Sequence, residues 1–169
     1  MKGEKIMKIL SLDQSTSCTG YSIFDNGELI EYGALKPSKK LNDVNMYSMF
    51  LKIVELIEKT NPDKILIEDV YMKMQKIYNK KDKKVGTMFN VATHKVLSNL
   101  QGMLIAYFML HQIEFEIIHP SSWQKMIKKK GTVNKDDTKS FVNEKYSINI
   151  KNDNISDSIA IGRFYLLKS

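Results

Sequence analysis

The chain has 169 residues and a net charge of +7, and 43% of its residues are hydrophobic while 27% are charged. These proportions are typical of a globular protein with one core, so we expect a single domain over residues 1–169. No apolar run approaches the ~20 residues that span a bilayer, so no membrane partner is expected. The single cysteine, Cys18, excludes an internal disulfide and a cysteine-rich zinc site, and it favours a reducing compartment, the cytoplasm.

Taken in chain order, the apolar patterns predict five strands and five helices. The strands are expected at residues 5–14, 20–25, 28–35, 64–70 and 113–120. The helices are expected at residues 41–60, 87–111, 122–127, 135–146 and 155–167. Three meandering strands followed by strands that alternate with helices predict an α/β fold, with a mixed five-stranded sheet flanked by helices.

The positive charge is concentrated in two segments. Residues 72–84 contain six lysines and one aspartate, and residues 125–139 contain six lysines and two aspartates. A polyanionic partner such as nucleic acid would explain this distribution, and an ordinary solvated surface would explain it equally well. Because residues 72–84 also lack a strong hydrophobic period, we expect them to form a basic, mobile segment within the domain.

Three acidic residues lie at the ends of predicted core elements. Asp13 follows the first strand, Glu68 lies near the end of the fourth strand, and Asp157 opens an apolar helix. Each has an ordinary structural explanation when taken alone, as a turn residue, an ion-pair partner or a helix cap. Together they favour a site for Mg²⁺ or Mn²⁺, because these cations prefer oxygen ligands and ligands collect at strand ends in such sheets.

Four stretches of the sequence together carry a family resemblance. They read ILSLDQSTSCTGYSIFDNGELIEYG, ILIEDVYM, IHPSSWQKMIKKKGTVNKDDTKSFV and NISDSIAIG. In order and spacing they resemble the RuvC-type Holliday junction resolvases, and the short, lysine-rich chain is similar to the phage-encoded members. The resemblance covers nearly the whole chain and implies the RNase H-like fold. For a phage protein, the implied location is the host cytoplasm.

The resemblance also implies an activity. It implies a metal-dependent endodeoxyribonuclease that cuts Holliday junctions and related branched DNA by paired nicks, with no small-molecule substrate. It further implies two Mg²⁺ ions per active site, for which Mn²⁺ can substitute, and it implies that the protein acts as a homodimer.

Carried over by position, Asp13, Glu68 and Asp157 match catalytic, metal-binding acids of this family. The remaining catalytic ligand of the family falls on Asn154, where the family usually has Asp or His. Three alternatives follow from this departure. Asn154 coordinates the metal as it stands, or the neighbouring Asp153 takes its place as a ligand. In the third alternative the metal site is weakened, and the protein binds junctions without cutting them.

The same resemblance marks residues for contact with DNA. Tyr71 falls where the family has an aromatic residue that stacks on bases near the crossover, although a strand-end core tyrosine is a close alternative. Lys135 matches a basic residue at the scissile region, and Lys125 lies one position away from another. The remaining lysines expected to contact DNA are Lys73, Lys76, Lys80, Lys81, Lys128, Lys129 and Lys130.

Two helices have more than one interpretation. The apolar helix predicted at 87–111 is expected either to form part of the dimer interface or to be an ordinary core helix, through Met88, Val91, Leu97, Leu100 and Leu104. The short helix at 122–127 contains Trp123, which we expect to be a packing anchor.

Two rival interpretations of the whole chain remain. Residues 12–25 also resemble the phosphate-binding hairpin of the sugar kinase and actin superfamily, but such kinases need two large domains. A small RNase H-like nuclease acting on structured RNA would share the three acids, and the two lysine-rich segments favour branched DNA over RNA.

Overall fold

The computed structural model describes residues 7–38, 45–71, 74–79, 84–128 and 131–168. The strands are β1 (Lys8–Asp13), β2 (Thr19–Asp25), β3 (Glu28–Leu35), β4 (Lys64–Glu68), β5 (Met74–Asn79), β6 (Lys84–Phe89) and β7 (Glu114–Ile118). The helices are α1 (Asn45–Thr60), α2 (Val91–Leu110), α3 (Pro120–Ile127), α4 (Lys135–Tyr146) and α5 (Asp153–Lys168).

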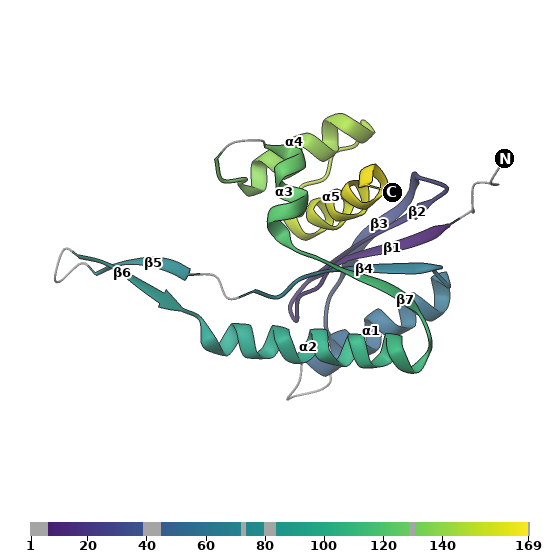
Figure 1. Ribbon diagram of the computed structural model, residues 1–169, viewed down its shortest axis with the longest axis horizontal. Helices are drawn as coiled ribbons and strands as arrows, with labels where there is room; N and C mark the ends of the chain where they lie inside the picture. Colours follow the sequence, from purple (N-terminus) through teal and green to yellow (C-terminus); the bar gives the residue numbers. More distant parts are fainter. Residues whose placement is uncertain (1–6, 39–44, 72–73, 80–83, 129–130, 169) are drawn as a thin grey trace.

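The predicted mixed sheet is confirmed. Five strands pair in the order β3-β2-β1-β4-β7, with β2 antiparallel to both β1 and β3 and β4 parallel to both β1 and β7. The turn between β2 and β3 places Asn26 and Gly27 at positive φ, as the Asn-Gly pair predicts. Figure 1 shows α1 and α2 on one face of the sheet and α3, α4 and α5 on the other.

Alternate residues of the central strands pack against these two helical layers. Leu10 and Leu12 of β1 are fully buried in a cluster with α1 and α2, whereas Ile9 belongs to the cluster formed with α3, α4 and α5. Leu66 of β4 belongs to the same cluster as Ile9. Because side chains alternate along a strand and both faces are apolar, a slip of one residue would exchange the two cores, and the register is therefore strongly fixed.

The helix predicted at 87–111 begins later than expected. Asn90 caps α2, since its side-chain oxygen accepts a hydrogen bond from the backbone N–H of Thr93 at 3.0 Å. Residues 84–89 instead form β6, which pairs with β5 in an antiparallel two-stranded sheet that the sequence did not predict. Figure 1 shows this hairpin extending away from the five-stranded sheet. That residues 72–84 form a mobile segment stays a prediction, and residues 72–73 and 80–83 lie outside the described residues.

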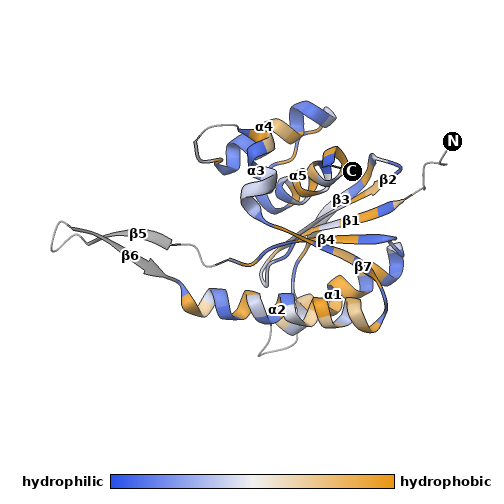
Figure 2. Cartoon of the chain, viewed as in Figure 1, coloured by the Kyte–Doolittle hydropathy of each residue, from blue (hydrophilic) through white to orange (hydrophobic). Residues whose placement is uncertain are grey.

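The apolar residues of α2 divide into a buried and an exposed set. Leu100 and Leu104 are completely buried in the core of their own chain, so the expectation that they contribute to a dimer interface was wrong. Met88 belongs to β6 and not to the helix. Figure 2 shows hydrophobic residues at both ends of α2. The large apolar side chains of α2 that are more than a third exposed are Val91, Val96, Met109 and Leu110.

Among the described residues, none of the helices combines the length and the apolar character that are needed to cross a membrane.

Candidate active site

The parallel pairing of β1 with β4 brings the first two predicted acids to one edge of the sheet. Leu12 lies opposite Ile67 in the ladder, so Asp13 and Glu68 follow as the next residues of the two strands. Both strands end there, and their carboxyl ends therefore present the two side chains at the same edge. The sequence predicted this placement, since the carboxyl ends of neighbouring parallel strands coincide.

Side-chain amides hold the backbone of Glu68 where the strand ladder ends. The backbone N–H of Glu68 donates to Gln14 Oε1 at 3.0 Å, and Gln14 Nε2 donates in return to the Glu68 carbonyl. Gln101 of α2 donates to the same carbonyl at 3.0 Å. Gln14 is buried, so its amide continues the β1–β4 pairing by one step beyond the last backbone pair.

Helix α5 brings the third acid to this edge. It lies across β1 and β2, where the Ser22 hydroxyl donates to the Ser158 carbonyl at 3.0 Å. At its start, the carbonyl of Asn154 lies so close to Gly20 that no side chain larger than hydrogen would fit there. These contacts place Asp157, one turn into α5, near Asp13 of β1.

The three carboxyl groups repel one another in a buried setting. The pKa of Asp13 is raised well above its ordinary value, chiefly by burial and then by the charges of Glu68 and Asp157. Burial, followed by the charge of Asp153, raises the pKa of Asp157 to about 6. The positive charge of Lys135 acts in the opposite direction and lowers the pKa of both Asp13 and Asp157.

The donor atoms of this edge fit a hard divalent cation. Asp157 Oδ1 is buried and has no hydrogen-bond partner among the described residues, although Thr138 hydrogen-bonds to the same carboxyl group. A buried acceptor without a donor is costly, and a bound cation would satisfy it. Within the described ranges, no three His, Cys, Asp or Glu side chains already form a group that could hold a metal ion. The observations that support the fit are the carboxylate chemistry and the unsatisfied oxygen.

The two candidates for the fourth ligand make other contacts. Asp153 forms ion pairs with Lys135 at 2.8 Å and with Lys139 at 3.0 Å, and these hydrogen bonds lower its pKa. Asn154 Nδ2 donates to the Cys18 carbonyl in the loop between β1 and β2. An aspartate could not donate this bond. The contact is therefore a structural reason for a neutral asparagine, rather than an aspartate, at position 154. Whether either residue binds metal stays a prediction.

Lys135 reaches the site because of a local helix signal. Asn134 caps α4 and forms a capping box with Asp137, in which each side chain accepts a bond from the other residue's backbone N–H. The cap starts the helix at Lys135, whose charge then acts on both Asp13 and Asp157. This position beside the acids agrees with the one that the family resemblance implies.

An aromatic pair borders the acids. Tyr71, which follows β4, is 41% exposed, and its ring lies 5.3 Å from that of His119 at an angle of 37°. His119 caps α3 by accepting a hydrogen bond from the backbone N–H of Ser121. The exposure of Tyr71 excludes a core tyrosine at this position, and stacking of Tyr71 on a base stays a prediction.

Sequence reasoning missed a contact between Trp123 and Glu68. Trp123 was expected only to pack, and it is indeed buried, but its indole N–H also donates to Glu68 Oε1 at 2.8 Å. No sequence signal could have found this contact, because the two residues are 55 positions apart and meet only after α3 docks on the sheet.

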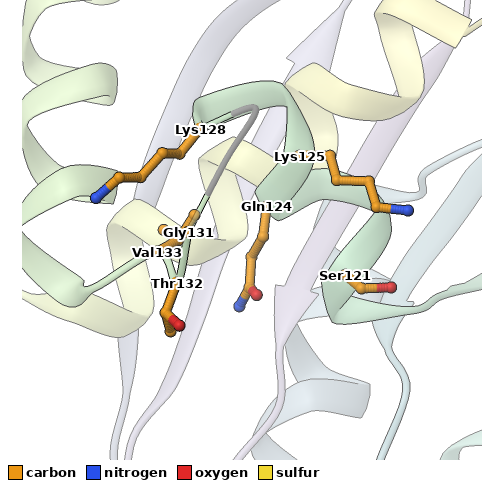
Figure 3. Close-up of a pocket in the computed structure, with 7 residues that line it drawn as sticks. All are labelled: Ser121, Gln124, Lys125, Lys128, Gly131, Thr132 and Val133. Atoms are coloured by element: carbon orange, nitrogen blue, oxygen red, sulfur yellow. The ribbon is translucent and has the colours of Figure 1, made fainter.

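Two of the predicted DNA-binding lysines border a pocket of about 320 Å³ beside α3. Its lining residues are Ser121, Gln124, Lys125, Lys128, Gly131, Thr132 and Val133. Figure 3 shows Lys125 and Lys128 extending from α3 in different directions, with Gln124 between them. Lys128 also forms an ion pair with Asp137 at 3.3 Å.

Lys73, Lys80, Lys81, Lys129 and Lys130 are outside the described residues, and Lys76 lies in β5, of which only the backbone is described.

Comparison with known sequences gives three full-length relatives. No protein-family model matches the chain. The crossover junction endodeoxyribonucleases RuvC of Dictyoglomus thermophilum and Dictyoglomus turgidum are each 27% identical to it over 169 residues, covering 96% of this chain and 98% of the relative. RuvC of Alkaliphilus metalliredigens is 23% identical over 164 residues, covering 92% of this chain and 90% of that protein.

Solved structures agree with the sequence relatives. Thermus thermophilus RuvC matches with a TM-score of 0.65 and 12% identity over 96% of both chains. The Fowlpox virus resolvase, solved with substrate Holliday junction DNA, matches with a TM-score of 0.59 and 16% identity over 95% of this chain and 99% of that one.

The chain is a distant relative of the RuvC-type resolvases. The resemblance read from the four sequence stretches is therefore confirmed, and so is the RNase H-like α/β fold. A phage origin stays a prediction.

The raised pKa values predict how stability depends on pH. In the folded chain Asp13 and Asp157 hold their protons more tightly than in the unfolded chain, so the folded state loses stability as the pH rises through these raised values. We expect Asp13→Asn to raise the unfolding midpoint at pH 8 in the absence of divalent cations. This increase in the midpoint should become smaller as the pH falls towards 4. For a chain of this size, each kcal/mol of added stability raises the midpoint by about 2–4 °C.

Thermal unfolding of the native chain and the variant between pH 4 and pH 8 measures this difference. Glu144→Gln, which neutralises an exposed carboxyl group of α4, is the control and should leave the midpoint nearly unchanged at every pH. A lower midpoint for Asp13→Asn at pH 8 would contradict the buried repulsion.

Proposed function

We propose that this chain is a metal-dependent endonuclease that cuts four-way DNA junctions and related branched DNA by paired nicks. The observation that carries the proposal is the meeting of Asp13, Glu68 and Asp157 at one edge of the sheet, where the latter two raise the pKa of the first. Repulsion of this kind is typical of functional sites, because a purely structural site would avoid it.

Each acid has a role in the proposed site. Asp13, Glu68 and Asp157 would hold two Mg²⁺ ions, for which Mn²⁺ can substitute, with Asn154 or Asp153 as a further ligand. When bound, such ions supply an activated water and charge stabilisation at the leaving oxygen. Lys135 would contact the phosphate that is cut, since its side chain is 74% exposed and its charge acts on two of the acids.

Two kinds of contact would bind the DNA around the acids. Tyr71 offers an exposed ring beside the site for stacking on an unpaired base, a contact that does not depend on sequence. Lys125 of α3 and Lys128, which follows the last residue of this helix, would contact backbone phosphates. The six lysines of residues 72–84 would add further positive charge for such contacts.

The relatives favour DNA junctions over the rival substrates. Structures similar to this chain include Thermus thermophilus RuvC in complex with Holliday junction substrate, which has a TM-score of 0.63 and 11% identity over 94% of this chain and 92% of that one. The curated relatives are named as crossover junction endodeoxyribonucleases. Neither an RNA substrate nor a binding-only role is favoured by these names. The cytoplasmic location stays a prediction.

Cleavage of a labelled four-way DNA junction in Mg²⁺ or Mn²⁺ tests the proposal. The native chain should introduce paired nicks in opposing strands, and Asp13→Asn should bind the junction with similar affinity but cut it at least about 10²-fold more slowly. A linear duplex of the same sequence and an RNA junction are the matched substrates.

Two results would contradict the proposal. Equal cleavage of duplex and junction would remove the structure selectivity. Junction binding by the native chain without cleavage in either metal would support the weakened-site alternative.

The lysines of α3 give a prediction about binding. In the Asp13→Asn background, Lys125→Ala with Lys128→Ala should weaken junction binding and reduce the slope of log Kd against log salt by about 2, because each lost phosphate contact removes about one released counterion. Lys59→Ala, on α1 across the sheet, is the charge-matched control and should leave the slope unchanged. Binding isotherms between 50 and 200 mM salt measure both, and an unchanged slope for the double variant would exclude phosphate contacts by these lysines.

The proposal includes a homodimer with one site in each chain. The candidate interface lies on α2, where Val96, Ala106 and Leu110 are exposed whereas Leu100 and Leu104 are buried. Apolar and small side chains in this arrangement allow two helices to pack closely.

Sedimentation of the native chain should give twice the mass of one chain. Ala106→Glu should shift it to the monomer without lowering the unfolding midpoint of the monomer, since the residue is exposed. Leu167→Glu, at the exposed end of α5, is the control and should remain dimeric. A monomeric native chain at micromolar concentration would contradict the dimer.

A further inference from the structure

Trp123 is the only tryptophan of the chain, and it connects α3 to the active site. Its side chain is 2% exposed, and its Nε1–H donates to Glu68 Oε1 at 2.8 Å. A buried indole N–H must find an acceptor, and a bond to a carboxylate is stronger than one to a neutral carbonyl. The contact therefore constrains the orientation of a carboxyl group that belongs to the proposed metal site.

The contact differs from the others that hold Glu68 in place. Gln14 and Gln101 act on the backbone of Glu68, so they fix where the residue sits in the strand. Trp123 acts on a carboxylate oxygen, so it restricts the torsions of the side chain itself. A phenylalanine at this position would fill most of the same space but could not donate the bond.

The helix that carries Trp123 also borders the proposed DNA surface. Lys125 and Lys128 line the pocket beside α3, while His119, which caps the helix, lies against Tyr71. The indole of Trp123 therefore connects α3, which is expected to contact DNA, to Glu68, which is expected to bind the metal.

We propose that Trp123 is a positioning residue that orients the Glu68 carboxylate for binding of the divalent cation. The inference rests on the proposed function, because it assigns Glu68 to the metal site. Residues that hydrogen-bond to metal ligands typically change metal affinity or activity by roughly 10–100-fold when they are removed. Loss of the indole donor should therefore weaken cation binding and slow cleavage by this factor, while junction affinity stays unchanged.

The donor can be removed without changing the shape of the side chain. Because the chain has one tryptophan, growth of a tryptophan auxotroph with 3-benzothienylalanine replaces Trp123 alone and substitutes sulfur for the N–H group. The matched control is 4-fluorotryptophan, which keeps the N–H. Trp123→Phe provides a genetically encoded version of the same loss.

Three measurements compare these proteins. Electron paramagnetic resonance of the free ion measures Mn²⁺ binding, and thermal unfolding measures stability. Cleavage of the four-way junction gives kcat and KM. We expect the benzothienyl protein to unfold within a few degrees of the native chain, to keep its KM, and to lose roughly 10–100-fold in Mn²⁺ affinity or kcat. The fluorotryptophan protein should match the native chain in all three.

Native Mn²⁺ affinity and native kcat in the benzothienyl protein would overturn the proposal and leave Trp123 as a packing residue. A lower unfolding midpoint with both of these values unchanged would do the same. Failure of the proposed function is a different result, in which the native chain shows no cation binding that Asp13→Asn abolishes.

The native protein supplies a second test that needs no variant at Trp123. Mg²⁺ is diamagnetic, so a change in tryptophan emission on its addition reports a change around the indole and not paramagnetic quenching. We expect the emission of the native chain to change with the same Mg²⁺ dependence as binding, and that of Asp13→Asn to stay constant. Unchanged emission in a native chain that binds Mg²⁺ would overturn the inference.

Discussion

The burial of mutually repelling carboxyl groups is the constraint on which the rest of this structure depends. Folding places Asp13 where both burial and the charges of Glu68 and Asp157 oppose its ionisation, and it leaves Asp157 Oδ1 without a partner among the described residues. Such an arrangement costs stability, and a protein tolerates it where the charges are used. The strand pairing, the docking of α5 and the nearby lysines can each be understood as ways to hold these groups together.

Polar side chains that act in place of backbone groups provide much of this support. Gln14 extends the β1–β4 ladder with its amide, and Asn154 ties the start of α5 to the Cys18 carbonyl. Ser22 adds a buried bond to the backbone of the same helix. The first two contacts satisfy backbone groups where regular hydrogen bonding stops, and the third joins the middle of β2 to α5 next to Asp157.

The two helical layers have different relations to the site. Helices α1 and α2 bury an apolar cluster against one face of the sheet, and α2 keeps further apolar residues on its exposed side. The opposite layer supplies Trp123 from α3, Lys135 from α4 and Asp157 from α5. Because Trp123 contacts Glu68 directly, the packing of α3 is coupled to the orientation of a proposed metal ligand.

The sequence by itself determined the sheet and the place of the acids. Apolar runs that end in Asp13 and Glu68 predict strand ends, and the helix predicted at 135–146 is observed as α4, which begins at Lys135. The sequence could not show that residues 87–89 of the predicted helix would instead belong to β6 and pair with β5, since pairing between strands depends on the partner. Only the tertiary structure decided that Leu100 and Leu104 are core residues, that Asp153 pairs with two lysines, and that Trp123 reaches Glu68. These contacts join residues far apart in the chain, and local patterns carry no information about the packing that brings them together.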